Sequence, residues 1–412
     1  MRVSFLGDTL CEPLLLTRSK TKNGEYDFKK TFSRLNKLFA KSDYVVCNLE
    51  TPLAGPQAGY TDSLFCFNAP LEFAEALKGS GIDLVLTANN HCLDRGETGA
   101  LETIKELDSI GLSHTGTFLK DSKRNYHITE IGGRKIAFIS FTYGTNFAQN
   151  HQVLSPNSPI KINMLANITA PPGKKPAPSS SSIIKKALMK LTSQETRIKI
   201  KKKLGMSYYQ AYRDDHFNQE SIAESVAQLI TAIEAAKAEA DYVVLCPHMG
   251  GQFNSEPGAF SKMIMDLAVE HGCDAVIASH PHVVQKALFK NGVPCFFSLG
   301  NFAMSPNSAY LLPDNLPEYG IVAHLDFPDQ PKHTEGNLAK EDIKVSFSII
   351  RSIEKDSEQL VVWPLVDLFQ NSDTVLKQRL LSDARKIVKA VSCKDDLIDT
   401  IVDEYVLEMN NA

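Results

Sequence analysis

The sequence has no closely spaced pair of cysteines, and this absence bears on the compartment of the protein. Its eight cysteines are scattered between Cys11 and Cys393, and several lie in strand-like apolar segments such as Tyr242–Cys246. A small secreted domain would instead show a framework of paired cysteines. The pattern therefore indicates buried, reduced thiols, and we predict a cytoplasmic protein.

The sequence also has neither a secretory signal nor a long uncharged apolar run. The first residues hold a short apolar stretch that ends at Asp8. A signal peptide needs a longer apolar region and a small-residue cleavage site, and a membrane span needs about 20 apolar residues. We therefore expect no membrane span. A net charge of −4 at pH 7 gives no global attraction to nucleic acid, so we expect no nucleic-acid partner.

Short apolar segments alternate with segments of helical spacing along most of the chain. Residues 3–6, 44–47 and 84–87 are apolar, and each segment ends in polar side chains. Apolar residues at helical spacing predict helices between these segments, and again near 219–239 and 258–271. Strands that alternate with helices pair in parallel, so the pattern predicts an α/β fold.

The last part of the chain has a different pattern. Residues 320–327, 343–350 and 360–365 read as antiparallel strands. Two helices are predicted after them, near 373–391 and 394–409. We expect these helices to form a C-terminal extension over residues 366–412, after a domain of residues 1–365.

A basic segment interrupts this domain. Residues 161–206 contain eleven Lys or Arg and one acidic residue, Glu195, which gives them a net charge of +10. We predict an insertion over about residues 155–215. Two interpretations stay open: a solvated lysine-rich loop, or an arm that binds an anionic substrate, polymer or surface.

Six polar clusters follow the predicted strands, at the point where each strand ends. They are Gly7-Asp8, Asn48-Leu49-Glu50, Asn89-Asn90-His91 with Asp94, Pro247-His248, Ser279-His280-Pro281-His282, and Gly300-Asn301. Open α/β sheets bind their ligands at the carboxyl ends of their strands. We therefore expect these clusters to lie together at one edge of a sheet.

The side chains of these clusters suit divalent metal ions. Asp8 and Glu50 offer carboxylate oxygens, and Asn90 offers a neutral carbonyl oxygen. The ring nitrogens come from His248, His280 and His282. Two neighbouring cations need such a set, with a carboxylate placed between them. Nitrogen and oxygen ligands without cysteine favour manganese, iron or zinc, and we predict one or two such ions.

In this combination and order, the clusters resemble the motifs of the CapA group of calcineurin-like metallophosphoesterases. The resemblance covers about residues 1–350, apart from the basic segment. It implies a four-layer α/β/β/α sandwich, with two mixed sheets back to back and the metal site at one end. It also implies two ligand sets that share Glu50 as a bridge: Asp8, Glu50 and His282 for one metal, and Asn90, His248 and His280 for the other.

The resemblance also implies a catalytic role for His91, which would protonate the leaving group or contact the developing anion. Asp94 lies three residues later, close enough on a helical turn to orient His91. One departure concerns the first motif, which is Asp-x-His in other metallophosphoesterases. Here Leu10 takes the place of that histidine, so the first metal is expected to be held weakly or not at all.

The sequence leaves three functions open. The CapA group is associated with poly-γ-glutamate capsule synthesis, which implies a metal-dependent hydrolase or transferase acting on an amide or ester of an anionic polymer. The second is a phosphoesterase acting on a small phosphorylated substrate. In both, metal ions would activate a water molecule for attack. The third is a non-catalytic binding protein with a degenerate metal site.

Overall fold

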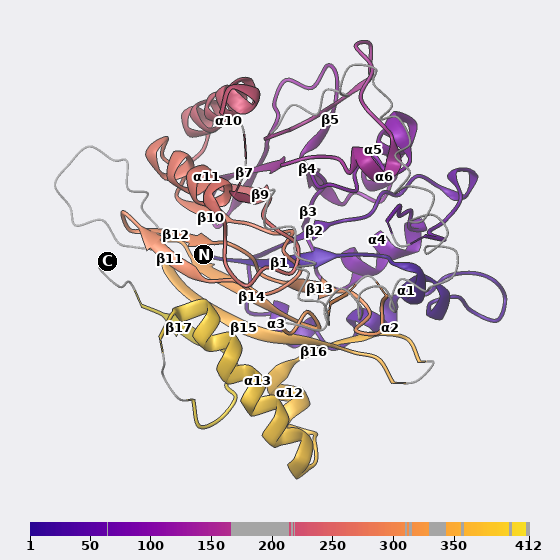
Figure 1. Ribbon diagram of the computed structural model, residues 1–412, viewed down its shortest axis with the longest axis vertical. Coiled ribbons are helices and arrows are strands. Elements are labelled where there is room, and N and C mark those ends of the chain that lie inside the picture. Colours follow the sequence, from indigo (N-terminus) through magenta and orange to yellow (C-terminus); the bar gives the residue numbers. More distant parts are fainter. Residues whose placement is uncertain are drawn as a thin grey trace, which may run out of the picture.

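A computed structural model gives the arrangement of the chain (Figure 1). It describes residues 1–63, 65–165, 214, 215, 217, 219–309, 311, 312, 315–328, 343–355, 358–394 and 398–408. These residues form a mixed α/β structure with sheets of nine, six and two strands. The α/β class expected from the sequence is confirmed. Most of the predicted insertion, and with it most of the basic segment, lies outside the described residues.

The nine-stranded sheet has the order β16-β15-β14-β1-β2-β3-β4, with β13 beside β1 and β17 beside β15. Its strands are β1 (Arg2–Thr9), β2 (Tyr44–Leu49), β3 (Leu84–Leu86), β4 (Ser113–Thr115), β13 (Asn301–Ala303), β14 (Tyr319–Asp326), β15 (Lys344–Ile353), β16 (Val361–Pro364) and β17 (Tyr405–Leu407). Strands β1 to β4 pair in parallel, whereas β14, β15 and β16 pair antiparallel, as the sequence predicts.

The six-stranded sheet has the order β11-β12-β10-β9-β7-β6. Its strands are β6 (His127–Ile131), β7 (Arg134–Thr142), β9 (Tyr242–His248), β10 (Ala275–Ile277), β11 (Ala287–Lys290) and β12 (Val293–Phe296). The four inner strands pair in parallel and the two edge strands antiparallel. The small sheet pairs β5 (Thr117–Leu119) with β8 (Ile160–Ile162).

The two large sheets share one hydrophobic core. Phe5 of β1 and Phe138 of β7 belong to the same buried cluster, and their ring centroids lie 6.1 Å apart. The alternate residues of β7, Ala137 and Ile139, belong to a second cluster on the other face of that sheet. Both faces of β7 are therefore buried, which explains why it reads as a continuous apolar run in the sequence.

Helices cover the remaining faces of both sheets (Figure 1). The helices are α1 (Pro13–Arg18), α2 (Lys29–Phe32), α3 (Asn36–Phe39), α4 (Leu71–Gly79), α5 (Gly96–Ser109), α6 (Phe147–Asn150), α10 (Gln219–Glu239), α11 (Ala259–Glu270), α12 (Leu365–Gln370) and α13 (Thr374–Ser392). Helices α10 and α11 share the cluster of β7 and β9, and α2 and α4 share a cluster with β2. The predicted helices near 219–239 and 258–271 are confirmed as α10 and α11. None of the described helices is long and apolar enough to cross a membrane.

One C-terminal prediction is wrong. The helix expected near 394–409 is absent from residues 398–408, where β17 pairs with Val345–Phe347 of β15. Tyr405 stacks on Phe347 with ring centroids 5.2 Å apart. The open edge of β15 offers backbone hydrogen bonds and an apolar surface, and these outweigh the local helical spacing.

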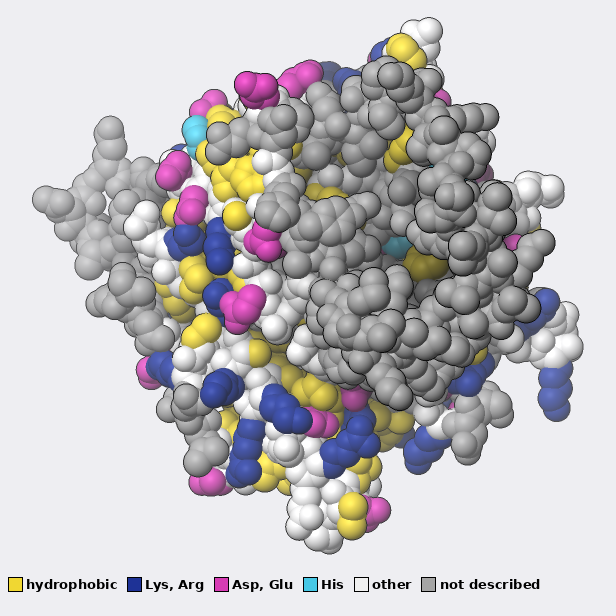
Figure 2. All heavy atoms as spheres, viewed as in Figure 1, with side chains coloured by type: hydrophobic (Ala, Val, Ile, Leu, Met, Phe, Trp, Pro, Cys, Tyr) yellow, Lys and Arg dark blue, Asp and Glu magenta, His cyan; other side chains and the backbone are white. Residues whose placement is uncertain are grey.

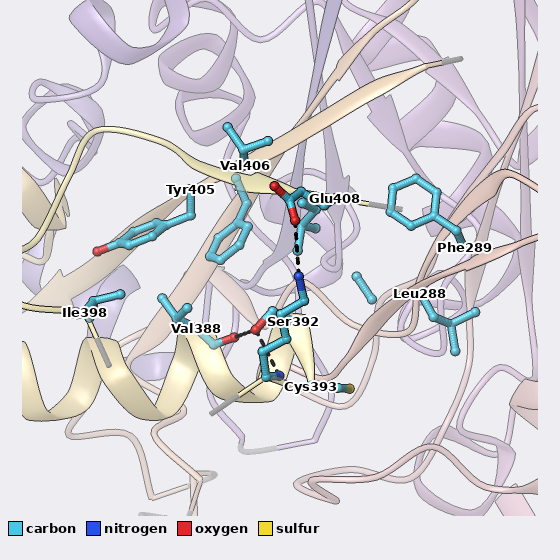
Figure 3. Close-up of a pocket in the computed structure, with 13 residues that line it drawn as sticks. Leu288, Phe289, Val388, Ser392, Cys393, Ile398, Tyr405, Val406 and Glu408 are labelled. Atoms are coloured by element: carbon cyan, nitrogen blue, oxygen red, sulfur yellow. Dashed lines mark hydrogen bonds and ion pairs between the residues drawn. The ribbon is translucent and has the colours of Figure 1, made fainter. Parts of the chain in front are cut away.

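The C-terminal segment closes the space between the edges of the two large sheets. Together with β11, the end of α13 and β17 line a cavity of about 420 Å³ (Figure 3). Apolar side chains such as Leu288, Val388 and Ile398 line it, and Lys394 pairs with Glu408 at 3.4 Å. Helix α13 turns its basic side chains outward, and Lys and Arg side chains gather on the lower part of the face in Figure 2, where α13 lies.

The start of α11 depends on Asp214, a residue far from it in the sequence. Gly258 precedes the helix and has no side chain to cap it. Buried Asp214 takes this role, because its carboxylate accepts hydrogen bonds from the backbone N–H of Gly258 (2.5 Å) and Ser261 (2.9 Å). These are two of the donors that a helix leaves unpaired at its N-terminus.

Replacing Asp214 by alanine should therefore lower the free energy of unfolding by about 2 kcal/mol, because a buried cap is lost. Urea unfolding followed by circular dichroism measures the effect. Asp215→Ala is the matched control, since Asp215 is exposed and makes a longer bond (3.2 Å) to Ala259 N. The control should change stability by less than about 0.5 kcal/mol. Equal effects of the two variants would contradict the capping role of Asp214.

Candidate metal centre

The carboxyl end of β1 positions Asp8. Gly7 lies so close to the neighbouring strand that a Cβ atom there would stand 1.8 Å from the carbonyl oxygen of Gly300. Asp8 donates its backbone N–H to that same oxygen at 3.0 Å, and its neighbours in register are Asn48 and Asn301. The glycine therefore allows β13 to approach, and Asp8 is left fully buried between β2 and β13.

Asn48 of β2 and Asn89, which lies after β3, hold neighbouring residues of the site in place. Asn48 donates from Nδ2 to Oδ1 of Asp8 at 2.7 Å. Asn89 donates from Nδ2 to the carbonyl oxygen of Leu49 at 2.7 Å and accepts the backbone N–H of His91 at 3.1 Å. Neither residue was assigned a role from the sequence. Asn48 stands two residues before Glu50 and Asn89 stands directly before Asn90, so their membership of two of the six clusters was the signal that pointed to them.

The three histidines come from β9 and from the loop after β10. His248 is the last residue of β9, and its Nε2 lies 2.6 Å from Oδ1 of Asn90 and 3.1 Å from Nδ1 of His280. His280 and His282 have φ angles of 109° and 58°. Residues other than glycine rarely adopt positive φ angles. Strained backbone of this kind is held in place at functional sites, and here it turns both rings inward.

The structure brings the predicted metal ligands together in two groups. Asp8, Glu50 and His282 each offer one ligand atom within 4.8 Å of the others, and Glu50, His248 and His280 do the same. Glu50 belongs to both groups, at the position expected of a bridge. Asn90 adjoins the second group through His248.

Glu50 shows that these groups fit a cation. Its side chain is fully buried, and neither of its oxygens accepts a hydrogen bond from a described residue. Burial, with the charges of Asp8 and Asp94, raises the pKa of Glu50 well above its usual range. Burial also lowers the pKa of His248 to about 3, which keeps its ring neutral, the form that binds metal. A divalent ion beside Glu50 would offset the cost of this buried carboxylate.

His91 and Asp94 form a buried pair beside this centre. Nδ1 of His91 lies 2.6 Å from Oδ2 of Asp94, the contact expected from their spacing. The backbone N–H of Phe67 also donates to Oδ2 of Asp94, at 2.7 Å. Nε2 of His91 faces the metal ligands and lies 3.9 Å from Oε1 of Glu50. Asn146, which the sequence analysis did not single out, places its Nδ2 atom 3.4 Å from this same Nε2.

Leu10 is part of an apolar wall next to the centre. It is fully buried in a cluster with six other apolar residues: Phe67, Phe253, Val283, Met304, Leu311 and Leu312. The ring of Phe67 lies 4.3 Å from that of His91, and the ring of Phe253 lies 5.7 Å from that of His282. Leu10 therefore packs where the resemblance would have placed a further histidine.

Asn301, in the last of the six clusters, also lies at the centre. Its Oδ1 atom is 3.0 Å from Nδ1 of His282. Its Nδ2 atom donates to the carbonyl oxygens of His282 (3.1 Å) and Pro317 (2.9 Å). Asn301 thus fixes the ring of His282 and leaves Nε2 directed toward Glu50, at 3.8 Å from Oε1.

A family model described as "Bacterial capsule synthesis protein PGA_cap" matches residues 2–306, which is most of the chain. The chain belongs to this family. All eight residues predicted for the site lie within the matched segment. The resemblance to the CapA group is therefore confirmed.

Curated relatives carry related names. The "PGA biosynthesis protein CapA" of Bacillus subtilis (strain 168) is 23% identical over 385 residues, 89% of this chain and 80% of the relative. The "Capsule biosynthesis protein CapA" of Bacillus anthracis is 24% identical over 358 residues, 83% of this chain and 71% of the relative.

Two solved structures show a distant likeness. A hypothetical protein from Thermus thermophilus has a TM-score of 0.38 and 14% identity, over 88% of this chain and 99% of that one. A 5′-nucleotidase from Candida albicans has a TM-score of 0.37 and 12% identity, over 84% of this chain and 50% of that one. At these values the likeness says nothing about the function of this chain.

Proposed function

We propose that this protein is a metal-dependent hydrolase or transferase of the CapA type. Its substrate would be an amide or ester of an anionic molecule, such as poly-γ-glutamate or a related cell-envelope polymer. The observation that carries the proposal is Glu50, a buried carboxylate with no hydrogen-bond donor among the described residues, shared by two groups of metal ligands. The names of the two Bacillus relatives support the link to capsule polymer.

The predicted ligands would hold one or two ions of manganese, iron or zinc. Asp8, Glu50 and His282 form one set, and Glu50, His248 and His280, with Asn90, form the other. The first set is the weaker, because Leu10 offers no ligand atom. When bound, the ions supply positive charge and an acidified water molecule.

His91 would donate a proton to the leaving group. Its Nδ1–H would donate to Asp94 while Nε2 faces the centre, so the proton given to the leaving group would be one that Nε2 carries when both ring nitrogens hold a proton. Leu10, Phe67 and Phe253 would keep bulk water away from one side of the reacting bond. A site that held only a structural ion would have no use for such a pair, so the pair favours catalysis over a binding role.

Two sheets that share a core, each with helices on its other face, suit a four-layer α/β/β/α sandwich of the metallophosphoesterase type. Residues 1–365 would form this domain. Residues 366–412 would be its extension, although α13 packs on the same core as the sheets. A cytoplasmic location stays a prediction.

A pair of substrates tests the proposed chemistry. Protein loaded with manganese, iron or zinc is incubated with a γ-linked glutamate oligomer, and new amino groups are measured. The same samples are tested on p-nitrophenyl phosphate. We expect metal-dependent release of amino groups, and a loss of at least about a hundredfold in Glu50→Gln, which keeps the side chain's size and removes its charge.

Two outcomes would contradict the proposal. Release of p-nitrophenol alone would make the protein a phosphoesterase, a reaction that the same ligand types support. Turnover of neither substrate by protein that holds its ions would instead favour a binding protein.

A further inference from the structure

A basic groove lies apart from the metal ligands. It has a volume of about 730 Å³ and is bordered by β8, by the turn after β5 and by one side of α10. Lys161 of β8 pairs in register with Phe118 of β5, and the backbone N–H of Lys120 donates to the carbonyl oxygen of Pro159 at 2.7 Å. The two adjoining segments therefore bring basic side chains to the same groove, together with Lys123 of the turn.

The groove keeps an excess of positive charge. In the described part of the chain, no ion pair joins Lys120, Lys123 or Lys161 to an acidic side chain, and all three are exposed. Arg124 also lines the groove but pairs with Glu239, and Glu224 of α10 adds one negative charge. Three lysines against one glutamate leave a net attraction for anions.

Strand β7 connects the groove to the metal centre. Thr142 of β7 pairs in register with His248 on one side and forms a bridge with Met164 on the other. Met164 is thus about two strand spacings, roughly 10 Å, from His248. It directly follows Asn163, which lines the groove and accepts the backbone N–H of Thr142 at 2.9 Å. The residue after Thr142, Tyr143, packs against His280 with ring centroids 4.6 Å apart.

We propose that this groove binds the carboxylate groups of an anionic polymer whose next units reach the metal centre. The proposal rests on the proposed function and adds to it a second contact with the substrate, outside the reacting bond. Lysine ammonium groups attract carboxylates as point charges, and the asparagine and serine side chains that line the groove offer further hydrogen bonds. Binding energy gained there would position the polymer for reaction.

The lining favours a polycarboxylate over nucleic acid. Grooves for single-stranded nucleic acid combine basic groups with several aromatic side chains on which the bases stack. Of the described residues that line this groove, Phe118 alone is aromatic, and it is half-buried.

The test is binding of a fluorescently labelled γ-linked glutamate oligomer, followed by anisotropy at an ionic strength of about 0.05 M. A chelator is present and all proteins carry His248→Ala, so that neither metal nor turnover contributes. Lys120→Gln/Lys123→Gln/Lys161→Gln should weaken binding about tenfold, as expected for three exposed ion pairs. Lys30→Gln/Lys105→Gln/Lys386→Gln makes the same charge change at exposed lysines elsewhere and should leave binding unchanged.

Three results would overturn the inference. Equal losses in both triple variants would mean that overall charge attracts the oligomer. Absence of binding to the parent protein would mean that the groove does not take this polymer. The third concerns single-stranded DNA with the same number of charges. If this DNA binds as tightly as the oligomer or more tightly, and the groove variant loses that binding, the groove is a site for nucleic acid. Because the assay involves no turnover, a failed hydrolase assay leaves this test intact.

Discussion

Replacing His248 by alanine is expected to remove the retained metal from this protein. After exposure to manganese, iron and zinc and thorough dialysis, the unchanged protein should keep between one and two ions per chain. His248 belongs to the second ligand group, and its Nε2 atom also contacts Asn90 and lies 3.4 Å from Oε1 of Glu50. Loss of a direct ligand should weaken binding at least about a hundredfold, since even residues that merely orient a ligand contribute roughly 10- to 100-fold. Elemental analysis per chain measures the result.

His271→Ala is the matched control for this experiment. His271 lies at the end of α11, where it is partly exposed and pairs with Glu234 at 3.6 Å, away from the metal ligands. This variant should retain the ions in full. Retention of ions by His248→Ala would contradict the assigned site. Absence of metal from the unchanged protein after all three treatments would favour a degenerate site, with Glu50 kept neutral by a proton.

The same samples also show whether the two ligand groups bind their ions with different affinities. The group of Asp8, Glu50 and His282 lacks a further histidine because Leu10 packs into the apolar wall instead. We therefore expect one ion to be released at a lower chelator concentration than the other. The temperature of thermal unfolding should fall when the tighter ion is lost. A free ion concentration of about a thousand times the dissociation constant adds about 4 kcal/mol to the free energy of unfolding.

The sequence predicted that the candidate metal ligands lie together because one topological rule brings them to the same place. Each cluster follows an apolar strand, and parallel strands place their carboxyl ends at the same edge. Asp8 lies at the carboxyl end of β1, Glu50 follows the neighbouring strand β2, and His248 ends β9 of the facing sheet. Helix α10 was also predictable, because its apolar spacing is long and regular.

Features that depend on distant parts of the chain were not predictable. Asn301 orients His282 through side-chain contacts that no periodic pattern signals. Asp214 caps a helix that begins 45 residues later. Strand β17 forms because β15 offers a free edge, and the sequence around Tyr405 does not reveal that edge. In each case the deciding energy is a tertiary contact that outweighs local preference.

Replacing His91 by alanine should lower kcat by about 10² to 10⁴, the usual contribution of a positioned proton donor, while KM and bound metal stay nearly constant. Asp94→Asn should lower kcat by about 10- to 100-fold, because a neutral amide would stabilise the doubly protonated ring of His91 less than a carboxylate does. Turnover of the γ-linked glutamate oligomer and metal content measure both effects.

A matched control for these variants exists outside the site. His114 and Asp108 form a similar pair, with Nε2 and Oδ1 3.2 Å apart, at a partly exposed position. His114→Ala and Asp108→Asn should leave kcat unchanged. An unchanged kcat in His91→Ala that keeps its ions would mean that water supplies the proton. The pair would then serve mainly to hold the backbone of Phe67, which donates to Asp94, and with it the apolar wall. In that case Asp94→Asn should affect thermal stability more than turnover.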